Sequence, residues 1–451
     1  MKKLIKRPKI ILIPYPAQGH VNPMVKLAFI LLNSGFEPVI ITPQFIHRRI
    51  ISTMDPTANI LCISIPDELP NEKQVSRDFF AIEKTLENTF PAHLETFLRK
   101  FCEDGEVSCM IVDLLASSAI DVGRRCGVPV AGFWPAMLAT YHLILAIPDM
   151  ITTGLISDSG NPQHEGPISI LPNQPSISTK DLPWLIGTQS ARKSRFKFWR
   201  RTLDRSANLP WILTNSFQEH SSTNKHTLLF QLGSLINTKN TITKNPSFWE
   251  EDNTSIHWLN KQKTNSVLYI SFGSWVSPIG EAKVRALALT LEAMKQPFIW
   301  VLAPAWREGL PLKFIESVRN QGKLVSWAPQ MEILKHHAVG CYLTHCGWNS
   351  TLEAVQCRKP LLCYPVAGDQ FVNCGYIVEK WKIGVKINGF AEKEIQESFK
   401  KVRDDKDMDK RLMRLYDKMM GEEATLRAMS NLNTFLHHLN NLQNQCLGYG
   451  L

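Results

Sequence analysis

Short apolar runs rich in β-branched residues alternate along the chain with longer stretches in which apolar residues recur at helical spacing. This alternation predicts βαβ units, in which crossover helices join parallel strands. We predict strands at 10–14, 38–42, 60–65, 109–113, 129–133 and 211–215, and a second series at 267–272, 298–302, 324–327, 340–344 and 361–364. The chain is therefore expected to have an α/β fold with two Rossmann-like, doubly wound parallel sheets.

The segment between the two series, residues 237–255, is polar and lacks apolar periodicity, which is typical of a linker. We place an N-terminal domain at 1–236, a C-terminal domain at 256–425 and a terminal helical segment at 426–451. A polar stretch at 158–175 is interpreted as a loop inserted in the first series. Ligands of doubly wound sheets bind at the carboxyl ends of the strands, so the loops after the strands are where we look for chemistry.

Composition and charge exclude only a few classes of protein. Of 451 residues, 44% are hydrophobic and 20% are charged, which excludes a disordered chain and a disulfide miniprotein. The formal net charge of +10 raises the question of nucleic acid or a membrane surface, but the excess is spread along the chain. Its densest segment, 192–205, has Phe196, Trp199 and Leu203 at helical spacing and predicts an amphipathic surface helix, with an acidic partner or peripheral membrane contact as the alternative.

The 10 cysteines include no CxxC pair and show no metal-ligand or disulfide spacing, so reduced, mostly buried thiols are expected. The apolar run after the basic N-terminus stops at Pro14, which is too short for a signal peptide, and no run of about 18 apolar residues indicates a membrane span. We therefore expect a cytoplasmic protein.

His20 lies where the first predicted strand passes into a helix predicted at 21–32. A lone histidine is more often a surface or core residue, but this one follows a Gly at the carboxyl end of a strand. Asp113 ends another predicted strand and could orient the imidazole through Nδ1. The alternative is that Asp113 only caps the following helix. Because no positioned Ser or Cys accompanies this pair, the nucleophile would be a hydroxyl group of the substrate.

Polar clusters follow three strands of the second series, at 327–330, 345–353 and 365–370. In the middle cluster, Gly347 permits close approach to the backbone, and 349–351 can open a helix whose N–H groups favour a diphosphate. Each residue alone could be a cap, a core residue or part of a turn. Together, the three strand ends offer groups for a base, a diphosphate and a sugar.

Residues 327–370 closely resemble the signature box of plant family-1 UDP-glycosyltransferases, metal-independent enzymes of the GT-B fold. The resemblance continues at 14–23 (PYPAQGHVNP), 215–217, 258–259 and 266–274, in the order expected for that family. It implies two Rossmann-like domains that face a cleft, and a last helix within 426–451 that packs back on the N-terminal domain.

The resemblance also implies roles for the candidate residues. His20 would be the general base and Asp113 its orienting acid. The donor-binding residues would be Trp327, Ala328 and Gln330 for uridine, Glu353 for the ribose, Ser274, His345, Gly347, Asn349 and Ser350 for the diphosphate, and Trp348, Asp369 and Gln370 for the sugar. In this family a closing Gln goes with UDP-glucose. No cofactor and no metal are implied, since the UDP-sugar is a co-substrate.

Three positions depart from the family pattern. Ala367 stands where an aromatic residue is usual, which removes a wall of the sugar site. Pro135 stands where many members carry a Thr thought to touch donor or acceptor. The usual Gly-Pro-Leu before the linker is Gly-Ser-Leu at 233–235.

We predict an inverting transfer of a hexose, glucose by the Gln370 criterion, from a UDP-sugar to a hydroxyl of a small hydrophobic acceptor, carried out by a monomer. Apolar acceptor contacts could come from Phe133, Trp134, Met137 and Trp184, which favours a phenolic or terpenoid alcohol.

One rival function is a non-catalytic UDP-sugar-binding protein with a degenerate site, and the presence of both His20 and Asp113 argues against it. The other rival is a nucleic-acid-binding protein, for which no RNP, zinc-finger or P-loop pattern is found. A metal-dependent transferase would need an Asp-x-Asp pair. The one at 407–409 lies in a charged run, which favours a solvated helix face.

Overall fold

The chain forms two compact units, and each is described by itself. The computed structural model describes residues 7–52, 59–67, 79–103, 107–169, 174–217, 227–237, 249, 251–273 and 279–448, the last of these with side chains to residue 441. The first unit comprises Met1–Tyr141, Phe198–Phe248 and Met419–Leu451, and the second comprises His142–Lys197 and Trp249–Lys418. The domain boundaries expected from the sequence remain a prediction, because this division groups residues 142–197 with the second half of the chain.

The first unit contains a parallel sheet of seven strands. In spatial order these are β3 (Leu61–Ile65), β2 (Glu37–Pro43), β1 (Lys9–Ile13), β4 (Val107–Asp113), β5 (Val130–Trp134), β8 (Trp211–Thr214) and β9 (Leu228–Gln231). Six of them confirm predicted strands, and β9 was not predicted. The central strands are fully buried, as expected for a parallel sheet that is covered on both faces.

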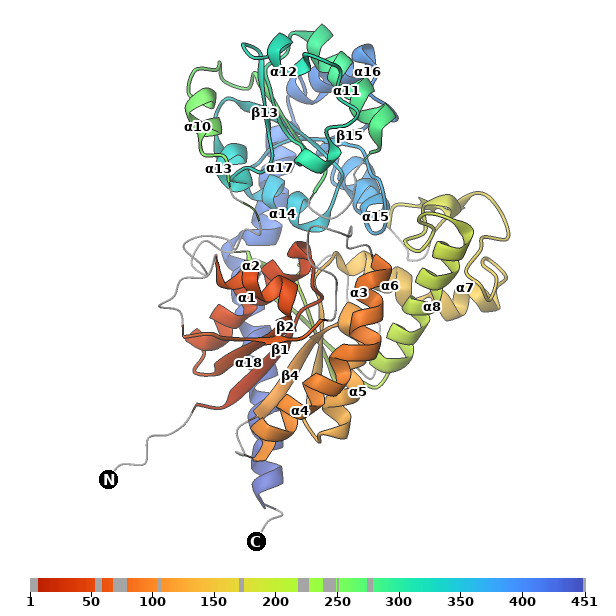
Figure 1. Ribbon diagram of the computed structural model, residues 1–451, viewed down its shortest axis with the longest axis vertical. Coiled ribbons are helices and arrows are strands. Elements are labelled where there is room, and N and C mark those ends of the chain that lie inside the picture. The colour runs from red at the N-terminus through yellow and green to blue at the C-terminus, as the bar shows by residue number, and fades with distance from the viewer. Residues whose placement is uncertain are drawn as a thin grey trace. The chain divides into compact units, whose positions relative to one another are not determined.

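Helices cover both faces of this sheet because the strand order reverses between β1 and β4, and right-handed crossovers then leave the sheet on opposite sides. On one face, α9 (Gly233–Ile236) contacts both α1 (Gln18–Asn33) and α18 (Glu422–Gly448). On the other, α4 (Phe90–Glu103) and α5 (Ser118–Arg125) lie side by side (Figure 1). The shorter α2 (Gln44–Ile51) and α3 (Phe79–Lys84) complete the covering.

The C-terminal helix α18 is tied to the end of the first sheet by hydrogen bonds as well as by packing. Ser234 Oγ donates to the Ala424 carbonyl at 3.0 Å, and Asn431 Nδ2 donates to the Gln231 carbonyl at 3.1 Å. The Phe435 ring lies 5.8 Å from the ring of Trp211, and Phe435 is fully buried. The last helix therefore belongs to the core of the N-terminal sheet.

The second unit contains a parallel sheet of six strands. Their spatial order is β12 (Gly322–Val325), β11 (Phe298–Val301), β10 (Val267–Ser271), β13 (Val339–Thr344), β14 (Leu361–Cys363) and β15 (Gly384–Lys386). Five strands were predicted and β15 was not. The two doubly wound parallel sheets confirm the predicted fold class.

Helices also lie on both faces of the second sheet. One group consists of α11 (Glu281–Met294) and α16 (Glu392–Arg403), which contact each other. The other group, in which successive helices contact each other, consists of α10 (Thr254–Leu259), α13 (Gln330–Lys335), α14 (Trp348–Gln356) and α15 (Gln370–Gly375). Two further helices in the second half of the chain are α12 (Phe314–Ser317) and α17 (Met408–Met420). Asp407 of the Asp-x-Asp pair is exposed and pairs with Lys410 at 3.1 Å, as the solvated-face interpretation expects.

The stretch predicted as a loop insertion has some regular structure. After α6 (Leu138–Leu145) and α7 (Ile147–Thr152), the strands β6 (Pro167–Ile168) and β7 (Ile177–Ser178) pair in an antiparallel way. The strand β7 contacts α15, and a Cβ placed on Gly375 would lie 3.1 Å from the Pro175 ring. The insertion therefore packs beside the helix that carries Gln370.

The basic segment 192–205 lies within a helix, α8 (Gln189–Ser206), as predicted. Phe196 is buried, whereas Trp199 and Leu203 are half-buried. The guanidinium of Arg205 binds Glu87 at 2.7 Å and Asp121 at 2.9 Å, and Arg201 pairs with Glu83. Part of the positive charge of this segment is therefore neutralised inside the protein itself. Across the described residues, none of the helices has both the length and the apolar character that crossing a membrane requires.

Candidate functional site

The first cluster lies at the reversal point of the first sheet. The strands β1 and β4 are parallel neighbours, with Ile13 opposite Val112, so the loops that follow them start side by side. Gly19 and His20 lie in the first turn of α1, and Asp113 is the last residue of β4. The His20 Nδ1 atom lies 2.8 Å from Asp113 Oδ2. The fold thus brings together the two residues that the sequence proposed as a pair.

Both carboxylate oxygens of Asp113 are used. Oδ2 accepts from the His20 imidazole, and Oδ1 accepts from the Leu115 backbone N–H at 2.9 Å. Capping and orientation were alternatives at the level of sequence, and the structure shows one side chain doing both. A carboxylate can only accept here, so the proton of a neutral His20 is held on Nδ1 and Nε2 carries the lone pair. Asp113 is fully buried, while 22% of the His20 side chain is exposed, so the basic nitrogen can be reached.

The second cluster surrounds His345, which follows β13. A Cβ added to Gly273 would lie 2.7 Å from His345 Nε2, and one added to Gly347 would lie 2.4 Å from it. The imidazole therefore fits in its position because residues 273 and 347 are glycines, and a side chain at either position would collide with the ring. Burial lowers the pKa of His345 to about 4, with the Ser271 backbone opposing this shift. The ring is neutral near pH 7 and brings no charge to an anion.

The helix α14 begins directly after this histidine. Gly347 is its N-cap residue and makes no side-chain cap hydrogen bond, and the N-terminus of a helix is a favourable place for an anion. Cys346 has φ of 66°, a left-handed conformation that reverses the chain between β13 and the helix. Asn349 and Ser350 lie in the first turn and are half-buried.

Gln330 is the centre of a hydrogen-bond network. Its Oε1 accepts from the hydroxyls of Tyr269 at 3.0 Å and Tyr342 at 3.2 Å. Its Nε2 donates to Ser350 Oγ at 3.2 Å and to Glu353 Oε2 at 2.5 Å. The side chain expected to contact uridine is thus engaged within the protein, where it fixes the carboxylate expected to hold the ribose.

The two tyrosines that bind Gln330 were not predicted from the sequence. Tyr269 and Tyr342 are register partners on β10 and β13, with ring centroids 4.9 Å apart. Burial raises the pKa of Tyr342 to about 12 and also raises the pKa of Tyr269, so both hydroxyls stay protonated and donate. The sequence feature that could have indicated them is a single tyrosine within each of two mainly apolar strands.

Trp327 and Ala328 follow β12. Trp327 is half-buried, and its ring centroid lies 6.2 Å from that of Trp249, with the planes tilted by 41°. Its carbonyl accepts from the Asp252 N–H at 3.0 Å, which ties the chain before α10 to this loop. Ala328 is buried. Ser274, expected at the diphosphate, lies outside the described residues.

Asp369 and Gln370 follow β14 and are both held by their surroundings. Asn373, which is fully buried and was not predicted, donates from Nδ2 to Asp369 Oδ2 and to the Cys346 carbonyl, each at 2.9 Å. Gln370 Oε1 accepts from the N–H groups of Val366 and Ala367 at 2.8 and 2.9 Å. The amide oxygen of Gln370 therefore braces its own loop, and the amide nitrogen is the part that can donate to a sugar.

Several expected contacts are instead part of the core. Trp348, predicted to line the sugar, is only 4% exposed, and its ring centroid lies 6.5 Å from that of Trp381. The apolar acceptor candidates Phe133, Trp134, Met137 and Trp184 are at most 2% exposed. The indole N–H groups of the two tryptophans are satisfied by backbone carbonyls. These four residues form core packing rather than the wall of an open pocket.

The chain is similar to known proteins both in sequence and in fold. The profile of the family described as UDP-glucoronosyl and UDP-glucosyl transferase matches residues 249–419. UDP-glycosyltransferase 82A1 of Arabidopsis thaliana is 50% identical over 464 aligned positions, covering 97% of this chain and all of the relative.

Two solved structures show the same fold at lower identity. The structure of Medicago truncatula UGT71G1 complexed with UDP-glucose superposes with a TM-score of 0.80 at 22% identity, covering 97% of this chain and 100% of the other. Phytolacca americana UGT2, complexed with UDP-2fluoro-glucose and pterostilbene, superposes with a TM-score of 0.77 at 22% identity, covering 96% and 100%.

Proposed function

The chain belongs to the family of UDP-glucoronosyl and UDP-glucosyl transferases, and we propose that it transfers glucose from UDP-glucose to a hydroxyl of a small apolar acceptor, with inversion at the anomeric carbon. The observation that carries this proposal is the 2.8 Å contact between His20 and Asp113 at the end of the first sheet. An enzyme without a nucleophile of its own needs such a base to activate the acceptor.

His20 is proposed to act through Nε2. As the acceptor oxygen attacks the anomeric carbon, its proton moves to Nε2, and the bond between that carbon and the UDP oxygen breaks. The buried carboxylate of Asp113 stabilises the imidazolium that forms. General-base assistance of this kind contributes a factor of about 10²–10⁴ to the rate. Displacement in one step converts an α-linked UDP-sugar into a β-glycoside.

The departing UDP is proposed to be stabilised by dipoles. The first turn of α14, which has no side-chain cap, presents the positive end of the helix dipole to the diphosphate, and the neutral His345 precedes this turn. Ser350 and Asn349 supply further polar groups in the same turn, and Ser274 is assigned there by family resemblance. The predicted absence of a metal requirement remains a prediction.

We assign the remaining contacts to the donor from the side chains that follow each strand. Trp327 stacks on the uracil, with Ala328 beside it. Glu353, held by Gln330, accepts from the ribose hydroxyls. Asp369 and the amide nitrogen of Gln370 bind the hydroxyls of the sugar. The glucose assignment is supported by UGT71G1 and UGT2, solved with UDP-glucose and UDP-2fluoro-glucose.

The acceptor is proposed to be a phenolic or terpenoid alcohol. UGT2, solved with pterostilbene, is a structural neighbour whose complex contains a small organic molecule. The four apolar residues first considered for this role are buried, so the acceptor contacts lie elsewhere in the first unit. The cytoplasmic location and the monomeric state remain predictions from the sequence.

Isothermal titration with UDP, UDP-glucose, UDP-galactose and UDP-glucuronate in metal-free buffer tests the donor assignment. Tight UDP binding together with a preference for UDP-glucose is the expected result. A panel of phenolic and terpenoid alcohols with the preferred donor then tests transfer, with His20→Ala as the variant that binds UDP normally but transfers nothing. Normal turnover by His20→Ala would remove the assignment of the base, and transfer only to sugars or peptides would remove the assignment of the acceptor.

Asp369→Ala tests where the sugar lies. We expect it to weaken binding of UDP-glucose far more than binding of UDP, because only the sugar contacts this carboxylate. Equal losses for both ligands would show that Asp369 serves the nucleotide or the fold. A protein that binds none of the four nucleotides would favour the rival reading of a degenerate site.

A further inference from the structure

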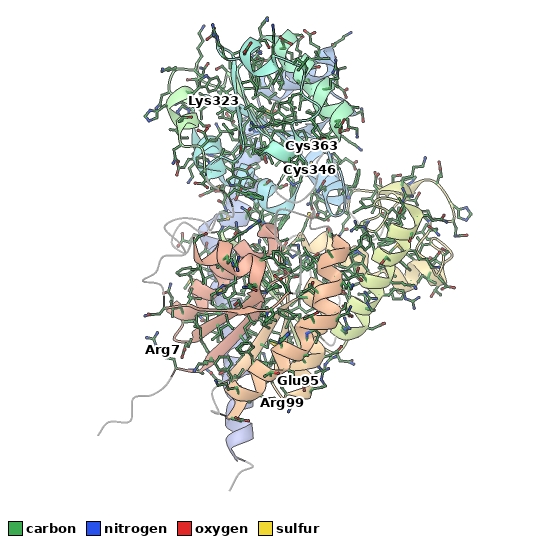
Figure 2. All side chains as sticks on the ribbon, in the orientation of Figure 1. Arg7, Glu95, Arg99, Lys323, Cys346 and Cys363 are labelled. Atoms are coloured by element: carbon green, nitrogen blue, oxygen red, sulfur yellow. The ribbon has the colours of Figure 1, made fainter. Side chains whose placement is uncertain are left out.

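Three thiols that are far apart in the sequence meet inside the second unit. Cys346 lies in the loop after β13, Cys363 is the last residue of β14, and Cys374 lies in α15. Their Sγ atoms all lie within 4.8 Å of one another, and all three side chains are buried. Figure 2 labels Cys346, which follows β13, and Cys363, which ends the neighbouring strand β14. Within the part of the chain that the structure describes, no other cysteines form such a group.

The backbone holds these thiols together. Thr344 and Cys363 are register partners on β13 and β14, and Cys346, two residues after Thr344, has the left-handed φ of 66° at which the chain turns. Asn373, the residue before Cys374, donates to the Cys346 carbonyl at 2.9 Å and so ties α15 to the same loop. The three thiols therefore lie close together because two strands, a turn and a helix are held in place by other contacts.

We propose that Cys346, Cys363 and Cys374 form a binding site for one thiophilic cation of the Cu⁺ or Zn²⁺ class. Thiolate sulfur is the ligand that selects such cations over the hard Mg²⁺ and Ca²⁺. At a metal–sulfur distance of about 2.3 Å, three thiolates around one ion lie about 4 Å apart. The observed spacing thus needs a contraction of less than about 1 Å, which rotation of three side chains can supply.

The site is separate from the chemistry proposed for glycosyl transfer. None of the three thiols is among the groups assigned to the donor or the acceptor, although Cys346 lies between His345 and Gly347 in the chain. Failure of the cation site and failure of the glycosyltransferase proposal are therefore independent results.

Cadmium is the probe, because its bonds to thiolates give an ultraviolet charge-transfer absorption. The full-length protein is reduced with a phosphine, freed of metal and titrated with Cd²⁺. We expect the band to saturate at one Cd²⁺ per chain and to be lost when Zn²⁺ competes. Cys363→Ala and Cys374→Ala should each reduce the absorption at one equivalent at least severalfold. The matched control is Cys341→Ala, a buried cysteine of β13 whose Sγ lies against the Pro360 carbonyl at 3.3 Å.

A measurement on the wild-type protein avoids any effect of these substitutions on folding. X-ray absorption at the cadmium edge, with one equivalent added, should show a first shell of three sulfur atoms. A shell of oxygen and nitrogen, or a band that survives in Cys363→Ala and Cys374→Ala while Cys341→Ala abolishes it, would overturn the proposal. Circular dichroism of each variant checks that it is folded before its titration is compared.

Discussion

His20 Nδ1 lies 2.8 Å from Asp113 Oδ2, although 93 residues separate the two along the chain. The contact exists because β1 and β4 are neighbours where the strand order reverses, so the loops after them share one edge of the sheet. The partly exposed imidazole supplies the chemistry, and the buried carboxylate fixes its tautomer. The pair is therefore a property of the topology as much as of the two residues.

Asp113→Asn should lower kcat by about 10²–10⁴ while leaving UDP affinity unchanged. An amide cannot fix the imidazole proton on Nδ1 as a carboxylate does, and it cannot stabilise the imidazolium. The Asn oxygen can still accept from the Leu115 N–H, so the cap and the thermal midpoint should survive. Steady-state rates at saturating donor and acceptor, with calorimetry for UDP, provide the check. An unchanged kcat would leave Asp113 with the capping role alone.

Gln330→Ala should weaken UDP binding by about 10-fold or more. The change removes the donor to Glu353 and Ser350 and takes this acceptor from the buried Tyr269 hydroxyl, at a cost of about 1–3 kcal/mol where a buried group is left unsatisfied. The Tyr342 hydroxyl keeps the Ser271 carbonyl as an acceptor at 3.4 Å. Tyr342→Phe is the control, because it removes one hydroxyl and keeps the Gln330–Glu353 contact. Calorimetry with UDP should separate the two variants. If both lose affinity equally, the network acts through the packing of the strands and not through Glu353.

Gly273→Ala and Gly280→Ala form a matched pair of substitutions. Both glycines have positive φ, 89° and 74°, so both variants carry backbone strain of about 1–3 kcal/mol. Only at Gly273 would the new Cβ meet the His345 ring, at 2.7 Å, whereas at Gly280 it meets nothing within 4 Å. We expect Gly273→Ala to lose UDP affinity by about 10-fold and Gly280→Ala to retain it. Equal affinities would show that the position of His345 does not matter for the donor.

The fold was largely predictable because the central strands are short, continuous apolar runs separated by helical patterns. The two missed strands lie at sheet edges. In β9, Leu228 is 47% exposed, and β15 has only three residues, none of them buried. The apolar run of β9 is only three residues long, 228–230, and β15 has none, so both strands are defined by their pairing with β8 and β14.

The sequence predicted which residues of the candidate site lie at the carboxyl ends of strands. Asp113 and His345 follow buried strands, and that position alone marked them. The direction of each side chain was not predictable, because it depends on neighbours from other elements. Gln370 turns its amide oxygen to its own loop, and Asn373 reaches Asp369 from the next turn of a helix. Three-dimensional hydrogen bonding, rather than residue type, decides these positions.

The pKa of His345 makes the stability of the protein depend on pH in a defined direction. The folded protein keeps the ring neutral down to about pH 4, whereas an unfolded chain takes up the proton near about pH 6.5. As the pH falls between these values, the unfolded state binds more protons, so the contribution to the free energy of unfolding is complete above about pH 6.5 and falls by roughly 3 kcal/mol at about pH 4. His345→Gln removes the titration but keeps an N–H donor. Thermal midpoints measured from neutral pH downwards should therefore fall more steeply for the wild type than for His345→Gln. Parallel curves would mean that the imidazole is as well solvated in the folded protein as in the unfolded chain.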